Sequence, residues 1–185
     1  MKKLALTLMA ATFVAASVFG QGPEMNNNEN TGIKKERKTE GQALRKLEGN
    51  EISGFAKENF LRDFPKASNV QWARVNTFDE AVFSVDGKDY KAFYDYDSHL
   101  VGTTTPVMVK DLPAKAANEI RKKYDGYTIE KVLEFHDNDA NITDMLLYGT
   151  QFEDADNYFA ELSNGKDIIV LKIGMNGSLY FFKKL

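Results

Sequence analysis

A short turn motif occurs twice in this chain, and each copy lies between two runs of alternating apolar residues. The first copy is Val85–Tyr90 (VDGKDY), and the second is Leu162–Ile168 (LSNGKDI). Asp-Gly and Asn-Gly favour two-residue β-hairpin turns, because glycine adopts positive φ without strain. Each copy also follows a segment with helical apolar spacing. The pattern therefore predicts one unit, a helix followed by antiparallel strands, that is present twice.

Two segments carry apolar residues at helical spacing. The first begins near Ile52 and ends at Pro65, and Ser53 is its expected cap. Its apolar residues are Phe55, Phe60, Leu61 and Phe64. In the second segment Asp111 is the expected cap, Pro113 lies in the first turn, and the helix closes at Gly126. One face of this second helix is expected to carry Ala114, Ala117, Ile120 and Tyr124.

The strands of the two units do not match throughout. In the first unit we expect strands at 70–75, 80–85, 88–94 and 100–104. The two copies align without gaps through the helix and the first strand, so that Trp72 corresponds to Val132. The distance in sequence between equivalent residues of the two copies is larger at the hairpin than in the helix and first strand. This difference places an insertion in the second copy near 136–157. Within it, residues 142–148 are expected to add a strand or to form a flap, and 179–182 is the last expected strand.

The amino-terminal segment is typical of a secretory signal peptide. Lys2 and Lys3 precede an apolar run from Leu4 to Phe19, which is short for a membrane-spanning helix of roughly 20 apolar residues. We expect a signal peptide over residues 1–20, cleaved at Gly20-Gln21 or, alternatively, near Ala16-Ser17, after which the chain leaves the membrane. The competing interpretation is an uncleaved membrane anchor.

Residues 21–50 are expected to form a flexible polar linker, with a transient helix at 43–47. The charged run 34–38 contains Glu36 and has no aromatic residue nearby, which is typical of a solvated linker. The formal net charge of −3 also argues against a nucleic-acid partner, because phosphates attract clustered Lys and Arg. There is no cysteine, so an exported chain of this kind is held together by packing. We expect a periplasmic or secreted protein.

The sequence contains none of the motifs that are typical of catalytic sites. The two histidines, His99 and His136, lie beside acidic residues, and cysteine is absent. The run Asp137–Asn141 alternates oxygen ligands as a calcium loop does, but Ile142 and Tyr148 stand where that loop needs Gly and Glu. We therefore predict a protein that is not an enzyme, with no catalytic residue, no metal site and no cofactor.

Several short motifs carry a resemblance to a known family. In the first unit they are Phe64-Pro65, Asn69–Trp72 (NVQW) and Asp86–Tyr90 (DGKDY). In the second unit they are Leu112-Pro113, Ile120 and Tyr124–Tyr127 (YDGY), where a proline is more usual at Asp125. These motifs resemble the PepSY-like family of secreted bacterial proteins, also described as β-lactamase-inhibitor-like. The likeness covers most of residues 56–185 and is more specific in the first unit.

The resemblance implies an α+β fold, a tandem repeat of a helix followed by antiparallel strands with the helices packed on one face of the sheet. The repeats are expected at 51–106 and 107–185. The resemblance implies no catalytic residues. The inhibitor name comes from proteins of similar fold that grip a β-lactamase with the exposed face of their sheet.

Three apolar residues are candidates for a protein-binding surface: Val82, Phe93 and Phe159. Strand alternation places Val82 and Phe93 on the sheet face opposite the predicted helices, where they are unexpected if that face meets only water. Around Phe159 the strands are apolar on both faces, which suggests cover on both. Two interpretations stay open. The insertion or the other repeat covers these residues, or they form an apolar patch that receives a protein partner.

The leading functional prediction is an exported, non-catalytic module that binds an extracytoplasmic protein and regulates or inhibits an enzyme there. A hydrolase that uses carboxylates across the two repeats is one alternative, and it requires a cleft. A carrier of a small ligand is the other. It requires a pocket between the repeats lined by Tyr and Phe.

Overall fold

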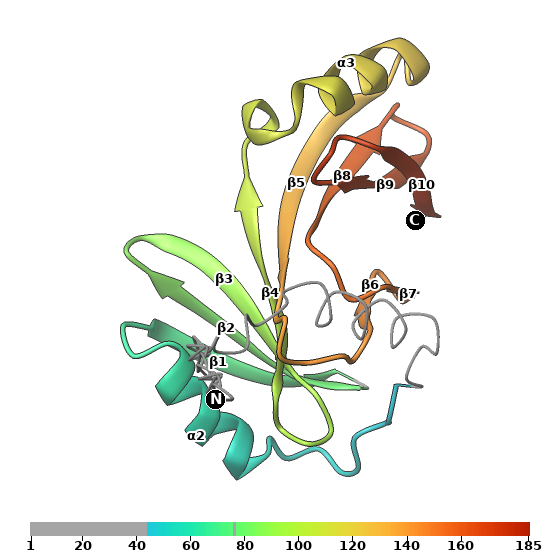
Figure 1. Ribbon diagram of the computed structural model, residues 1–185. Helices are drawn as coiled ribbons and strands as arrows, with labels where there is room; N and C mark the ends of the chain where they lie inside the picture. Colours follow the sequence, from blue (N-terminus) through green and yellow to red (C-terminus); the bar gives the residue numbers. More distant parts are fainter. Residues whose placement is uncertain (1–43, 76) are drawn as a thin grey trace, which may run out of the picture.

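The protein is an α+β fold built on one large antiparallel sheet (Figure 1). A computed structural model describes residues 44–75 and 77–185, so the predicted signal peptide and the linker up to residue 43 lie outside the described residues. The sheet has eight strands in the order β1-β2-β3-β4-β5-β8-β9-β10, and β6 and β7 pair separately. The strands are β1 Ser68–Val75, β2 Phe78–Val85, β3 Lys88–Tyr94, β4 Leu100–Val107, β5 Thr128–Asp137, β6 Met145–Leu147, β7 Thr150–Phe152, β8 Asn157–Ser163, β9 Ile168–Gly174 and β10 Leu179–Lys184.

Helix α2, Gly54–Asp63, packs on the first four strands. Its start is the predicted one, since the Ser53 hydroxyl accepts a hydrogen bond from the Ala56 amide at 3.4 Å. Its buried face differs from the prediction, because Ala56 and Phe60 enter the core whereas Phe55 and Leu61 are exposed. The core under this helix consists of Ala56, Phe60, Ala81, Phe83, Ala92 and Tyr94.

Helix α3, Ala114–Lys123, packs against strands β5, β8 and β9, and Figure 1 shows the two helices at opposite ends of the molecule. The prediction that Asp111 caps this helix was wrong. Asp111 ends a short 3-10 helix, Val109–Asp111, and its carboxylate accepts from the Met108 amide, while Pro113 holds the N-cap position. Ala114, predicted to face the core, is exposed. The core here consists of Leu112, Ala116, Ile120, Val132, Tyr158, Ala160, Leu162, Ile169, Leu171 and Ile173.

The two turn motifs form hairpins with different centres. In the first hairpin Val85 pairs with Lys88, so Asp86 and Gly87 form the turn as predicted. In the second, the Asn164 amide donates to the Asp167 carbonyl at 3.2 Å, which makes Gly165 the first central residue rather than the second. The Asn164 side chain explains the shift, because it accepts hydrogen bonds from the backbone amides of Lys166 and Asp167.

The β6–β7 hairpin, within the segment that the sequence predicts to be an insertion, covers the face of the sheet that lies opposite the helices. Residues 145–152 fold into the β6–β7 hairpin, and Met145 and Phe152 are buried against strands of both halves. The ring centroid of Phe152 lies 5.2 Å from that of Phe135 and 4.9 Å from that of Phe159. The buried residues of this third core are Phe78, Phe93, Val101, Phe135, Met145, Phe152, Phe159 and Val170.

Ordered contacts begin earlier than Ile52, where the sequence placed the start of the folded part. Residues 44–50 contain no helix, contrary to the expected transient helix. Leu47 is nevertheless buried, and Leu44 packs against the core under the hairpin. The Arg45 guanidinium pairs with the Asp97 carboxylate at 3.2 Å and lies over the Tyr96 ring. The last seven residues assigned to the linker are therefore part of the folded structure.

Candidate functional site

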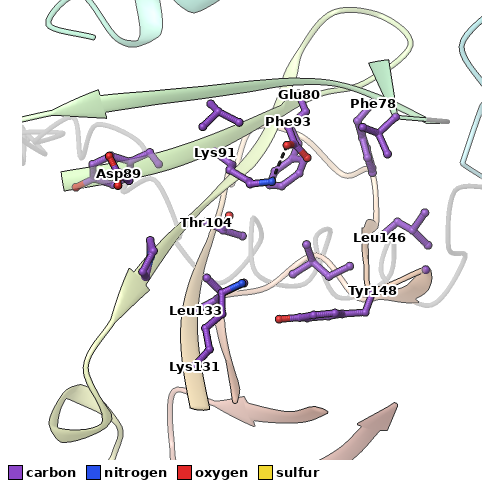
Figure 2. Close-up of a pocket in the computed structure, with 16 residues that line it drawn as sticks. Phe78, Glu80, Asp89, Lys91, Phe93, Thr104, Lys131, Leu133, Leu146 and Tyr148 are labelled. Carbon is purple, nitrogen blue, oxygen red and sulfur yellow. Dashed lines mark hydrogen bonds and ion pairs between the residues drawn. The ribbon is translucent and has the colours of Figure 1, made fainter. Parts of the chain in front are cut away.

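A groove with a largely apolar lining lies on the sheet face opposite the helices (Figure 2). Strands β1 to β5 form its floor and one wall, and the β6–β7 hairpin forms the other wall. Its volume is about 410 Å³. The lining is chiefly apolar: Val75, Phe78, Val82, Phe93, Pro106, Leu133, Leu146 and Leu147. The groove therefore lies between strands β1–β5 and the β6–β7 hairpin.

The structure brings together two of the three predicted binding residues and separates the third. Val82 is half-buried and Phe93 is 5% exposed, and both line the groove. Phe159 is fully buried beneath Phe152 and does not line it. For Phe93 and Phe159 the interpretation of cover by the insertion is thus the correct one, because the hairpin lies over them. Only Val82 remains as part of an accessible apolar surface, and replacing Phe93 by serine would disturb the core.

Two ion pairs stand in and beside the groove, and both turn their cation toward solvent. On β3 the Lys91 ammonium lies 2.7 Å from the Glu80 carboxylate, and on β5 Lys131 lies 3.4 Å from Glu161. Each lysine side chain is 49% exposed, whereas the Glu80 and Glu161 side chains are 15% and 20% exposed. Figure 2 shows Lys91 and Lys131 on separate strands, with Thr104 of β4 between them. Two half-exposed lysine side chains therefore line the groove together with its apolar residues.

Tyr148 fixes the hairpin wall in place. It occupies the β6–β7 turn with Gly149, and both residues have positive φ. Its hydroxyl donates to the Glu161 carboxylate on β8 at 2.6 Å, and its carbonyl accepts from the Lys183 ammonium on β10. Burial, and then the hydrogen bond to Glu161, raise the pKa of Tyr148 above its ordinary value. The groove is thus held open by contacts within the chain.

Two tyrosine–carboxylate pairs should make the fold sensitive to alkali. Burial raises the pKa of Tyr94, as does the hydrogen bond from its hydroxyl to Asp63 at 2.9 Å, and Tyr148 behaves alike. In the unfolded chain both hydroxyls ionise near pH 10. Their contribution is present below that pH and is lost as the pH rises toward the higher folded pKa, because the unfolded state then binds fewer protons.

We expect each tyrosine to cost roughly 1 kcal/mol of stability one pH unit above 10. Urea unfolding at about pH 8 and about pH 11 measures this loss, and the double variant Tyr94→Phe/Tyr148→Phe should show a smaller decrease between them. An equal decrease in the variant and the wild type would contradict the assignment.

The acidic residue Asp95 stabilises the β3–β4 turn through hydrogen bonds within the chain. The Asp95 carboxylate accepts hydrogen bonds from the backbone amides of Asp97 and His99, at 2.9 and 3.0 Å. It also accepts from the Asn141 amide group at 2.9 Å and from the Thr143 hydroxyl at 3.3 Å. Within residues 44–75 and 77–185, no group of three or more His, Asp or Glu is placed to hold a metal ion. Asp95 thus joins the β3–β4 turn to the insertion.

The sequence reasoning missed the groove residues that come from the insertion and from β5. From the sequence, Leu146, Leu147 and Tyr148 are expected only as part of an added strand or flap, and no motif points to Lys131. A signal was present, because Tyr148-Gly149 places a Gly-containing turn directly after the apolar run Met145–Leu147. The sequence does not show where a separate hairpin docks, since that depends on contacts with distant strands.

Comparison with known proteins identifies the fold. No family model matches the chain, and no curated protein matches it in sequence. A crystal structure of a BLIP-like protein from Bacteroides fragilis is similar with a TM-score of 0.57 and 14% identity, over 73% of this chain and 87% of that one. A DUF2874 family protein from Bacteroides uniformis gives a TM-score of 0.59 at 14% identity, over 72% of this chain and 90% of that one.

A third structure, from Bacteroides eggerthii and provisionally named periplasmic, gives a TM-score of 0.58 at 12% identity over 72% of this chain and 89% of that one. At such identities the likeness shows the fold alone, and that fold is BLIP-like. In the part of the chain that the structure describes, neither helix has the length and apolar character needed to cross a membrane.

Proposed function

We propose that this chain is an exported, non-catalytic module that binds an extracytoplasmic protein through the groove between β1–β5 and the β6–β7 hairpin. The observation that carries the proposal is the preformed apolar groove with two half-exposed lysines beside it. Protein interfaces combine an apolar centre with a polar rim in this way. A regulator or inhibitor of an enzyme in that compartment is the role that fits such a surface.

The polar groups of the groove support binding better than catalysis. Glu80 is ion-paired with Lys91, and Asp89 accepts a hydrogen bond from the Ser84 hydroxyl at 2.9 Å. A general acid would need a carboxyl group that is free of such ion pairs and hydrogen bonds within the chain. The proposal therefore ranks a carboxylate-dependent hydrolase below a binding module, with no catalytic residue and no cofactor assigned.

We further propose that residues 51–106 and 107–185 are two copies of one unit and that the chain is PepSY-like. The alignment equates Phe60 with Ile120, and both residues are buried. The carbonyl of each also accepts the hydrogen bond that closes the end of its helix. The Phe64 amide donates to the Phe60 carbonyl at 2.8 Å, and the Tyr124 amide donates to the Ile120 carbonyl at 2.9 Å. The insertion then gives the second copy the hairpin that forms the wall of the groove.

The proposed setting is the periplasm or the exterior, after removal of the predicted signal peptide. A similar fold in a protein provisionally named periplasmic supports this placement. The partner would be a protein of the same compartment. The acidic net charge of −3 argues against a nucleic-acid partner.

A carrier of a small ligand is the second candidate, because such a carrier requires a pocket lined by Tyr and Phe, and the groove has these residues. They are Phe78, Phe93 and Tyr148. Its volume of about 410 Å³ falls within the range of small-molecule sites. Mass spectrometry of the native purified chain distinguishes the two, since a carrier retains a small molecule at one per chain.

The binding proposal is tested by removing two apolar side chains from the groove. The variant Val82→Ser/Leu147→Ser should weaken binding of the captured partner by about tenfold or more, because each truncation removes apolar area that the partner would cover. The partner is first isolated from a periplasmic extract with the wild-type chain. Its affinity for both chains is then measured by calorimetry.

A matched control replaces two exposed apolar residues on α2, in the variant Phe55→Ser/Leu61→Ser. The control should bind the partner as the wild type does. Equal affinity of the groove variant and the wild type would contradict the proposal, provided that thermal unfolding shows the groove variant to be folded. Loss of binding in the control alone would place the interface on α2.

A further inference from the structure

The chain contains two Asn-Gly pairs, Asn164-Gly165 and Asn176-Gly177, and both lie in turns that join strands of the sheet. In such a pair the backbone nitrogen of the glycine can attack the side-chain amide of the asparagine, because glycine has no Cβ to obstruct the approach. In a folded protein the attack also depends on the burial and the hydrogen bonds of that nitrogen. The two turns differ in both respects.

In the β8–β9 turn the attacking nitrogen is accessible. Asn164 and Gly165 are both exposed, and among the described residues no atom lies within 4 Å of a Cβ placed on Gly165. The Gly165 amide donates to the Ser163 hydroxyl at 3.2 Å. A hydrogen bond to an exposed hydroxyl exchanges with water at little cost, so the Gly165 nitrogen can be released to react.

The same turn polarises the carbonyl group that is the target of the attack. The Oδ1 atom of Asn164 accepts hydrogen bonds from the backbone amides of Lys166 and Asp167, at 2.9 and 2.8 Å. Two amides directed at one carbonyl oxygen stabilise the negative charge that develops there when a nucleophile adds to the carbon, as in an oxyanion hole. The β8–β9 turn therefore combines an accessible nucleophile with an activated carbonyl.

In the β9–β10 turn the attacking nitrogen is protected. The Gly177 amide donates to the Gly174 carbonyl at 2.8 Å, so its proton is held within the backbone. Gly177 is also buried against the start of α3, since a Cβ placed on it would lie 3.1 Å from the Cβ of Lys115 and 3.3 Å from that of Pro113. Attack at this pair therefore requires the turn to open first.

We propose that Asn164-Gly165 is a self-modification site that deamidates spontaneously, while the fold protects Asn176-Gly177. The Gly165 nitrogen bonds to the Cγ atom of Asn164, the Cγ–Nδ2 bond breaks, and Nδ2 leaves as ammonia with the proton of the Gly165 amide. Water then opens the succinimide ring at either of its two carbonyls and leaves aspartate or isoaspartate at position 164. Each event adds one negative charge to the chain.

The two products should differ in their effect on the β8–β9 hairpin. An aspartate keeps side-chain oxygens that accept from the amides of Lys166 and Asp167, so the turn is retained. An isoaspartate lengthens the main chain by one carbon and disturbs the bond between the amide of residue 164 and the Asp167 carbonyl, which is 3.2 Å long in the unmodified chain. The flanking strands contribute Leu162 and Ile169 to the core under α3, so this product should be less stable.

Incubation of the folded chain in mildly alkaline buffer, followed by mass spectrometry of its peptides, tests the site. Deamidation at Asn164 should be at least about tenfold faster than at Asn176, because each 1.4 kcal/mol or so needed to open the second turn slows attack there tenfold. In concentrated guanidinium chloride, which unfolds both turns, the two rates should become nearly equal. Equal rates in the folded chain, no conversion of Asn164 there, or an unchanged difference after unfolding would overturn the proposal.

Two variants at the same position complete the test. Asn164→Gln keeps an amide but requires a larger ring, so position 164 should stay unmodified over the same incubation. Freshly purified Asn164→Asp represents the aspartate product and should unfold at the temperature of the wild type. Wild-type chain enriched in isoaspartate should unfold at a lower temperature. Conversion of Asn164→Gln at the wild-type rate, or equal unfolding temperatures for the isoaspartate and aspartate forms, would contradict the assigned chemistry.

Discussion

Replacement of Asp79 by alanine is expected to lower the free energy of unfolding by about 3–5 kcal/mol, the usual cost of leaving a buried charge without its partner. The Asp79 side chain is 1% exposed and that of Arg74 13% exposed. The guanidinium of Arg74 donates to both carboxylate oxygens, each at 2.8 Å. This hydrogen-bonded pairing raises the pKa of Arg74. The guanidinium keeps its charge even when the carboxylate is removed, because an arginine side chain is always protonated in proteins.

The pair also connects the segment before α2 to the sheet. The Ser53 amide donates to Asp79 at 2.8 Å, and Arg74 donates to the Glu48 carbonyl at 2.6 Å. The variant Asp79→Ala therefore leaves a cation and a backbone amide unsatisfied at once. Urea unfolding followed by circular dichroism measures the loss.

The control for this prediction is Asp97→Ala. Its carboxylate pairs with Arg45 on the surface, where both side chains are more than half exposed. That change should cost no more than about 1 kcal/mol. The double variant Arg74→Met/Asp79→Leu should recover part of the stability lost in Asp79→Ala, because it removes both charges together. A loss below about 1 kcal/mol in Asp79→Ala would mean that water reaches the pair.

Replacement of Gly102 by alanine is expected to cost about 3 kcal/mol, at the upper end of the usual range for overpacking. A Cβ atom at this position would lie 2.5 Å from the His136 carbonyl oxygen and 2.6 Å from the Phe135 ring. Phe135 is fully buried between β4 and the hairpin, in contact with Phe152, so its ring has little room to move. Gly102 thus lets the Phe135 ring lie directly on the backbone of β4.

Gly54→Ala is the matched control, because no atom lies within 4 Å of a Cβ placed there. It should leave stability unchanged or raise it by roughly 0.5 kcal/mol, since alanine favours helices. Thermal unfolding of both variants compares the two sites. If Gly102→Ala unfolds at the same temperature as the wild type, β4 and β5 approach less closely than described.

The sequence correctly predicts the turns and helix caps that depend on interactions between residues close together in the chain. The β2–β3 hairpin and the bounds of β3 follow from the Asp-Gly turn and the flanking alternation. The Ser53 cap follows in the same way, because the hydroxyl and the amide it serves are three residues apart. The α+β class with its antiparallel sheet was likewise predicted from the sequence and is confirmed.

Prediction from the sequence failed where contacts between residues distant in the chain determine which side chains are buried. Phe55 and Leu61 have apolar character, yet the helix turns Ala56 and Phe60 inward because Phe83 and Trp72 provide the matching surface for Phe60. Phe93 could be covered or exposed according to strand alternation alone. Only the position of the hairpin over strands of both halves answers the question, and no local propensity encodes it.

The groove also depends on contacts between segments that are distant in the sequence. Val82 was predicted as a binding residue from its face on β2, but its opposite wall comes from residues more than 60 positions later in the chain. The hydrogen bond between Tyr148 and Glu161 that fixes this wall joins the insertion to β8. A site formed by the strands of a sheet and by a separate hairpin is not visible in either segment of the sequence alone.

Amide hydrogen exchange of the chain, with and without its captured partner, tests the groove proposal most directly. We predict that the partner slows exchange in β2, in β3 and at residues 145–150, and leaves α2 and α3 unaffected. Exchange of the Val82→Ser/Leu147→Ser variant should be unaffected by the partner at the concentration that protects the wild type. Protection confined to the helices, with none along the groove, would contradict the proposal.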